Sequence, residues 1–155
     1  MIRHTRHDML ELLCLIFSIK LEDVPSFASP QALATSCHVD LDLVRRIEDI
    51  GLLRSEPSRP GRHYDADDAR VTAVVAELID LGASDQDIDD YGRHLLQRCE
   101  KCGPEPCPTR CDAIEVLRTL LRRIAEKHGD RAGRRPLVIR IERAITSIDA
   151  LADLI

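Results

Sequence analysis

The chain of 155 residues has no tryptophan and only two phenylalanines and two tyrosines. Its core must therefore be built mainly from aliphatic side chains, and the aromatic stacking platforms that bind single-stranded nucleic acid are not expected. The sequence also lacks an excess of positive charge, because 22 Lys and Arg stand against 27 Asp and Glu, for a formal net charge of −5 at pH 7. This balance excludes binding of nucleic acid in the manner of a histone, so any contact with DNA must come from a local basic patch.

Long apolar runs are missing as well. A membrane-spanning helix needs about 20 apolar residues, and the most apolar stretch, from Met9 to Phe17, is interrupted by Glu11 and soon followed by Lys20. A charge inside this stretch also argues against a signal peptide. With 44% hydrophobic and 32% charged residues, we expect a soluble, cytoplasmic protein with one ordinary domain, or a small domain plus a helical appendage.

Recognisable catalytic motifs are also missing. None of the six histidines has the spacing of a metalloprotease helix or of a catalytic triad. The acidic segment Asp85–Asp90 lacks the glycine and the closing glutamate of a calcium loop, and its carboxylates are typical of the start of a helix. We therefore expect that the protein is not an enzyme.

Cysteine, by contrast, is abundant, and four of the six cysteines lie in one segment with the spacing C-x2-C-x4-C-x3-C. Gly103 and three prolines in this segment prevent a regular helix and favour tight turns. Four thiolates held this close together can converge on one metal ion or cluster. The candidate metal ligands are Cys99, Cys102, Cys107 and Cys111.

Several chemistries suit such a cluster. Paired disulfides are disfavoured because the cytosol keeps thiols reduced, and a dithiol redox switch is a minor option suggested by the neighbouring cations. We expect Zn²⁺ at the four thiolates, with an iron–sulfur cluster as the alternative. The solitary Cys14 and Cys37 are expected to be small buried apolar residues.

Apolar spacing and terminal residues predict a mainly helical protein. Helices are expected over about 7–20, 31–36, 41–50 and 66–81, from 85 to the cysteine segment, from about 112 to 128, and from 136 to the end. Ser29, Asp40 and Asp65 are the expected N-caps, and Gly51 and Gly82 the expected helix ends. Two short strand candidates, 52–54 and 62–64, flank a tip rich in Pro, Ser and Gly and predict a wing.

The last two predicted helices carry seams of apolar residues at alternating three- and four-residue spacing. This pattern is typical of a dimeric coiled coil or of a close antiparallel pair. A helix that packs on its own domain gives the same pattern, so the sequence leaves these arrangements open. The seam residues are Ile114, Leu117, Leu121 and Ile124 in the first helix, and Val138, Ile141, Ile145, Ile148, Ala152 and Ile155 in the second.

The block Ala32–Leu53, ALATSCHVDLDLVRRIEDIGLL, and the continuation PGRHYDADDARVTAVVAELIDLGASDQDI resemble the DNA-binding part of MerR-type bacterial transcription regulators. The resemblance covers about residues 28–98 and implies a mainly α fold with a winged helix-turn-helix. The chain then divides into an N-terminal helical extension (1–27), the winged-helix domain (28–98), the four-cysteine metal loop (99–111) and a helical dimerisation or effector region (112–155).

The resemblance also implies roles for individual residues. Arg45 stands at the recognition-helix arginine that contacts DNA, and Arg62 and Tyr64 stand at the wing positions that hold phosphate. Arginine offers a planar donor fork to phosphate or guanine, and tyrosine adds one hydroxyl donor. Other candidates for the same basic patch are Arg46, Arg54, Arg59 and His63.

The sequence departs from the family pattern in the recognition helix. Asp42 occupies a position that is usually basic, and Arg46 and Ile47 replace an aromatic pair. From 41 to 64 there are five arginines against two aspartates and two glutamates, so the predicted interface has little excess charge.

These features together predict a homodimeric DNA-binding transcription regulator. Its expected partners are duplex promoter or operator DNA, a second copy of the chain and RNA polymerase, with no membrane. The four-cysteine centre would couple the winged helix to the dimerisation helices or fix the junction between them. The alternative is a metal-stapled, MerR-like protein-interaction module or adaptor that does not bind specific DNA sequences.

Overall fold

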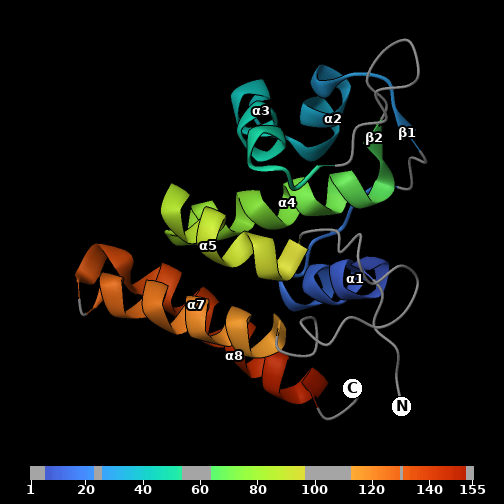
Figure 1. Ribbon diagram of the computed structural model, residues 1–155. Helices are drawn as coiled ribbons and strands as arrows, with labels where there is room; N and C mark the ends of the chain where they lie inside the picture. Colours follow the sequence, from blue (N-terminus) through green and yellow to red (C-terminus); the bar gives the residue numbers. More distant parts are fainter. Residues whose placement is uncertain (1–5, 23–25, 54–63, 97–112, 130, 153–155) are drawn as a thin grey trace.

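The computed structural model describes residues 6–22, 26–53, 64–96, 113–129 and 131–152. Over these ranges the protein is mainly helical, with one small antiparallel sheet (Figure 1). Within the same ranges no helix combines the length and the apolarity needed to cross a membrane. The elements are α1 (Arg6–Ile16), β1 (Ser26–Phe27), α2 (Pro30–Cys37), α3 (Leu41–Ile50), β2 (Tyr64–Asp65), α4 (Ala66–Leu81), α5 (Asp85–Leu96), α7 (Ala113–His128), the short 3₁₀ helix η2 (Ala132–Arg134) and α8 (Arg135–Ala152).

Helix α4 runs through the middle of the molecule (Figure 1). Helices α2 and α3 and the β1–β2 sheet lie on one side of it, while α1, α5 and the antiparallel hairpin of α7 and α8 lie on the other. Two hydrophobic cores form around it, and α3 contributes to both, because Val44 lies in the smaller core and Ile47 in the larger one. The smaller core, beneath α2 and α3, consists of Phe27, Leu33, Ala34, Val44, Tyr64 and Ala69. Among the described residues, the larger core has twenty buried side chains, drawn mainly from α1, α4, α7 and α8.

Local capping signals explain most helix ends. The hydroxyl of Ser29 accepts a hydrogen bond from the backbone N–H of Ala32 (3.1 Å) with proline at the next position. Asp65 and Asp68 form a reciprocal capping box at the start of α4, with both bonds 2.9 Å long. Asp40 occupies the N-cap of α3 as expected, but its side chain makes no capping hydrogen bond.

Helix α1 is shorter than the sequence pattern suggests and is an integral part of the larger core. It ends at Ile16 rather than near residue 20, because Ser18 adopts a positive φ of 55°. Met9, Leu10 and Leu13 are buried against the rest of the chain. The segment therefore belongs to the packed body and is not a detached extension.

The wing strands differ from the expectation. Residues 52 and 53 are not in a strand, and Tyr64 pairs with Phe27 of β1, while Asp65 pairs with Ser26. No sequence pattern indicates β1, because two residues are too few for a recognisable alternation of polar and apolar side chains. The expected tip, 54–63, lies outside the described residues.

Five seam residues of the last two helices are buried within the chain itself, while Val138 and Ile145 are partly buried. Leu117, Leu121, Ile124 and Ile141 are all 0% exposed, and Ile148 is 1% exposed. Of the arrangements that the sequence left open, the structure shows an intramolecular antiparallel pair packed on its own domain. A homodimer would therefore have to use other faces of these helices.

The ends of α4 and α7 meet in a close contact. Gly82 ends α4 with a φ of +117°, and a Cβ atom there would lie only 2.6 Å from Nε2 of His128. The same Nε2 lies 2.7 Å from the carbonyl oxygen of Leu81. Glycine is thus required here both by its backbone conformation and by the histidine that packs over it.

Candidate nucleic-acid interface

Helices α2 and α3 are joined by a turn of three residues. His38, with a φ of 56°, ends α2, and its N–H faces the carbonyl oxygens of the preceding turn. Helix α3 then begins after Asp40 and is anchored by Val44 and Ile47, which are 0% and 1% exposed. Because these two residues fix the rotation of α3 on the domain, its outward face is set by the helical period.

The outward face of α3 has balanced charge. It consists of two aspartates and two arginines, all exposed: Asp42, Arg45, Arg46 and Asp49. Arg45 extends from this face, and no carboxylate of the described residues is paired with it. Arg46 instead forms an ion pair with Asp85 at the start of α5.

Tyr64 is buried and holds two elements of the fold together. Its side chain is 1% exposed in the smaller core, and its hydroxyl donates a hydrogen bond to the carboxylate of Glu48 on α3. A hydroxyl has one proton to donate, so in this conformation Tyr64 does not offer it to a phosphate, contrary to what the resemblance implies. The bond instead ties β2 to α3.

The remaining wing candidates lie outside the described residues. They are Arg54, Arg59, Arg62 and His63.

The four clustered cysteines, Cys99, Cys102, Cys107 and Cys111, also lie outside the described residues. Their segment connects α5 to α7, two helices that pack against each other. Among the described residues, no group of three or more His, Cys, Asp or Glu could hold a metal ion.

The two solitary cysteines are partly buried. Burial raises the pKa of both thiols, that of Cys37 to about 11. The Cys37 thiol also lies 3.6 Å from the carbonyl oxygen of Ala69 and donates to it. Burial therefore favours the protonated form of both thiols at neutral pH.

The first turn of α5 connects α3 to the helical hairpin, a feature that sequence reasoning missed. Asp85 pairs with Arg46 of α3, whereas Asp87 lies 3.0 Å from Nζ of Lys127 and 3.7 Å from Nε of Arg123, both on α7. The sequence pattern Ser84-x-x-Asp87 indicates a helix start, and the structure shows the corresponding reciprocal bonds of 3.0 and 3.1 Å. The partners lie about 40 residues away in sequence, so no local signal could have identified them.

Asp87 is well placed to remain ionised. Burial opposes its ionisation, but hydrogen bonds from Ser84 and Lys127 outweigh that effect and hold the pKa of the Asp87 carboxyl below its ordinary value. The side chain is only 3% exposed. The contact between α5 and α7 is therefore charged over the neutral pH range.

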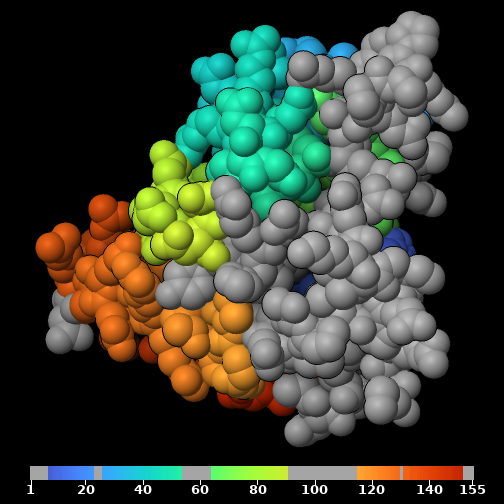
Figure 2. Space-filling model, in the orientation of Figure 1, coloured from blue at the N-terminus to red at the C-terminus, as the bar shows by residue number. Residues whose placement is uncertain are grey.

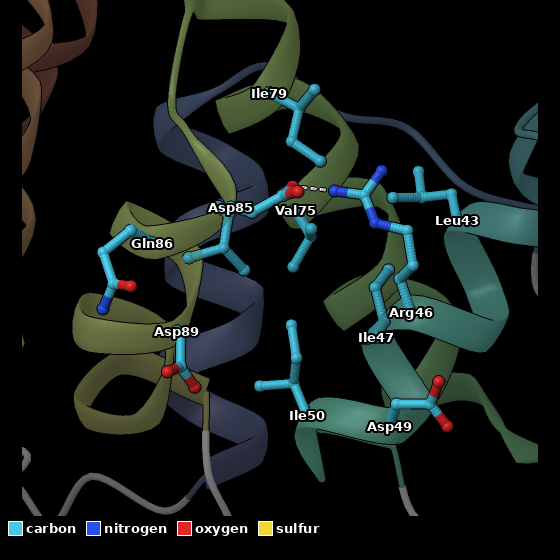
Figure 3. Close-up of a pocket in the computed structure, with 11 residues that line it drawn as sticks. Leu43, Arg46, Ile47, Asp49, Ile50, Val75, Ile79, Asp85, Gln86 and Asp89 are labelled. Atoms are coloured by element: carbon cyan, nitrogen blue, oxygen red, sulfur yellow. Dashed lines mark hydrogen bonds and ion pairs between the residues drawn. The ribbon is translucent and has the colours of Figure 1, made fainter.

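A groove of about 360 Å³ lies between α3, α4 and α5 (Figure 3). We call it the α3–α5 groove. The Arg46–Asp85 pair spans it, as Figure 3 shows. In the space-filling view, α3, the start of α5 and the hairpin follow one another down one side of the molecule (Figure 2). The residues that line the groove are Leu43, Arg46, Ile47, Asp49, Ile50, Val75, Ile79, Asp85, Gln86, Ile88 and Asp89.

Comparison with known proteins adds no assignment, because no family model, no curated protein and no solved structure matches this chain. A function must therefore be argued from the residues and the geometry above.

Proposed function

We propose that the protein is a transcription regulator that binds duplex DNA through a MerR-like winged helix-turn-helix. The observation that carries this proposal is the unit formed by α2, its three-residue turn and α3, seated on α4 beside the β1–β2 sheet. In a helix-turn-helix the second helix enters the major groove. Here that helix is α3, and its outward face carries Arg45.

Arg45 is the residue on α3 best suited to contact DNA. Its guanidinium is exposed and has no carboxylate partner in the described ranges, so binding a phosphate or a guanine edge breaks no such ion pair. Arg46 would first have to leave Asp85. Arg59, Arg62 and His63 remain wing contacts proposed from the sequence, and Tyr64 acts indirectly by holding β2 against α3 through Glu48.

The metal centre and the dimer complete the proposal. The four thiolates of the cysteine segment would hold Zn²⁺, or alternatively an iron–sulfur cluster, between α5 and α7. An effect of the site on α3 would have to be transmitted along α5, whose first turn, at the other end of that helix, is paired with both α3 and α7. We further propose a homodimer that presents two such units to operator DNA and to RNA polymerase, and no catalytic activity.

Fluorescence anisotropy with a labelled duplex at increasing salt tests DNA binding. We expect Arg45→Ala to weaken binding about 5- to 150-fold, the equivalent of about 1–3 kcal/mol for a good arginine contact. If the contact is to phosphate, the salt slope falls by about 1. The matched control is Arg122→Ala, which removes an exposed arginine of α7 and should leave binding unchanged. Unaltered binding by an Arg45→Ala/Arg62→Ala double variant would overturn the proposal.

A second candidate function is a metal-stapled protein-interaction module. The balanced charge of the outward face of α3 favours it, because two aspartates directed at phosphates would repel them. Wild-type protein that fails to retard random duplex DNA even at low salt would support the adaptor. Retardation that weakens steeply with salt supports the regulator.

Anaerobic purification with an absorbance spectrum and elemental analysis tests the metal centre. About one zinc per chain in a colourless protein is the expected result. Iron, sulfide and charge-transfer bands would instead identify a cluster. Purified protein that contains neither zinc nor iron would overturn the proposal of a metal centre.

A further inference from the structure

We propose that the α3–α5 groove is a binding site for a small amphipathic cation, a molecule with an apolar body and one ammonium or guanidinium group. The ligand's positive group would take the place of the Arg46 guanidinium beside Asp85. Binding would thereby disconnect α3 from α5.

The floor of the groove is apolar and firmly held. Ile47 of α3, Val75 of α4 and Ile88 of α5 are 1%, 1% and 2% exposed, so the walls belong to the packed core and are preformed. A volume of about 360 Å³ lies within the range of small-molecule sites, which are mostly apolar with a few placed polar groups. The partly exposed apolar residues around this floor are Leu43, Ile50 and Ile79.

The rim of the groove is acidic. Asp49, Asp85 and Asp89 line the groove beside the apolar floor, and among its described lining residues Arg46 is the only cation. Asp49 and Asp85 together exceed the single charge of Arg46, and this excess of negative charge favours a cation and repels an anion. Asp85 is 78% exposed on its side chain, so an incoming cation can reach it from solvent.

The Arg46 guanidinium already occupies the position beside Asp85 that the ligand's positive group would take. Its guanidinium crosses the groove from α3 to pair with Asp85, with the aliphatic side chains of Val75 and Ile79 close by (Figure 3). An exposed ion pair is worth only about 0–1 kcal/mol. A cationic ligand that also buries an apolar body in the groove can therefore compete with it.

Binding of the cation would free Arg46 on α3 from its ion pair, so that its charge becomes available for contact with DNA. With Asp85 occupied by the ligand, Arg46 is free to turn toward a phosphate beside Arg45. This consequence rests on the proposed DNA-binding function, whereas binding of the cation itself does not.

Isoleucine-methyl NMR tests the site on the intact chain. The probe is octyltrimethylammonium, and its matched controls are octanesulfonate and 1-octanol, all below concentrations at which they aggregate. We expect the cation alone to give saturable shifts, concentrated on the methyl groups of Ile47, Ile50, Ile79 and Ile88. Equal effects of the three probes, or shifts spread over isoleucines outside the groove, would overturn the proposal.

Variants that remove carboxylates test the contribution of the acidic rim. Asp85→Asn combined with Asp89→Asn should weaken binding of the cation about five- to tenfold, because two screened surface charges are lost. Asp90→Asn is the matched control, since Asp90 lies on the same helix but does not line the groove. These are exposed or partly exposed positions, and circular dichroism checks that the variants fold. Wild-type affinity in the double variant would overturn the role of the acidic rim.

DNA titrations with and without octyltrimethylammonium test the coupling. We expect the cation to change the DNA affinity of the wild-type protein by a few-fold and to leave that of Arg46→Ala unchanged. If the wild-type protein binds no DNA, the proposed function fails, while the methyl shifts still decide the ligand site. If the cation binds in the groove but the wild-type DNA affinity does not change, the coupling is overturned.

Discussion

The two hydrophobic cores of this protein are built in different ways. The larger core consists of aliphatic residues and methionine, and its helices are held together by the interlocking of many side chains. In the described part of the chain the smaller core has six buried residues, and two of them, Phe27 and Tyr64, are aromatic and are paired across the β1–β2 sheet. With only two Phe and two Tyr in the whole sequence, half of the aromatics serve this small unit, where their large buried area compensates for the small number of residues.

Polar contacts also hold the edge of the smaller core. The Ser29 cap, the Asp65–Asp68 capping box and the Tyr64–Glu48 hydrogen bond all lie at its edge. A small core gives less stabilisation than a large one, so specific hydrogen bonds determine more of its geometry. The comparison predicts that the α2–α3 unit opens independently, whereas the helical body unfolds as a whole.

Leu121→Ala should have the largest effect. Leu121 is 0% exposed at the centre of the larger core, and truncation there costs about 2–5 kcal/mol because a cavity remains. Urea unfolding followed by circular dichroism measures the loss. Leu15→Ala, at a position 68% exposed on α1, is the control and should change stability by less than about 0.5 kcal/mol. Similar costs at the two positions would contradict the packing described for α7.

Leu33→Ala tests whether the smaller core is a separate unit. Leu33 is also 0% exposed, but its core is small and can partly collapse, so we expect a cost near the lower end, about 2 kcal/mol. Hydrogen exchange should show faster opening of amides in α2 and α3 with little change in α7 and α8. Uniform acceleration over both cores would show that the two are a single cooperative unit.

Asp87→Asn tests the charged contact between α5 and α7. The lowered pKa of Asp87 means that its carboxylate stabilises the fold above the unfolded-state pKa of about 3.9, and that this stability is lost as the pH falls through the folded-state value. At pH 7 the variant should be less stable by about 1.5 kcal/mol, the lower end of the range for hydrogen bonds to charged groups. The difference should disappear in strongly acidic solution. Urea midpoints at both pH values check this, and a pH-independent difference would exclude the charge as its cause.

Asp65→Ala should have a smaller effect, confined to the start of α4. The cap that it removes is worth about 1 kcal/mol. Asp40→Ala is a matched control, because Asp40 stands at the N-cap of α3 without a capping hydrogen bond and should cost clearly less. Thermal unfolding of the two variants measures the difference, and equal losses would show that N-cap position matters here more than the side-chain bond.

Local sequence signals specify the helical class and most of the helix ends. Ser29-Pro30, Asp65, Gly51 and Gly82 act through bonds and backbone angles within a few residues, so their effect is visible in the sequence. The aliphatic character of the larger core followed in the same way from the scarcity of aromatic residues.

The partners of the exposed and apolar faces of the helices are visible only in the folded structure. The seams of α7 and α8 have the same spacing whether they meet a second chain or their own, and only the packed structure shows that Leu121 and Ile141 are buried within one chain. Likewise, Tyr64 reaches Glu48, and Arg46 reaches Asp85, a residue 39 positions away. Such partners depend on contacts between distant segments, and local periodicity and capping carry no information about them.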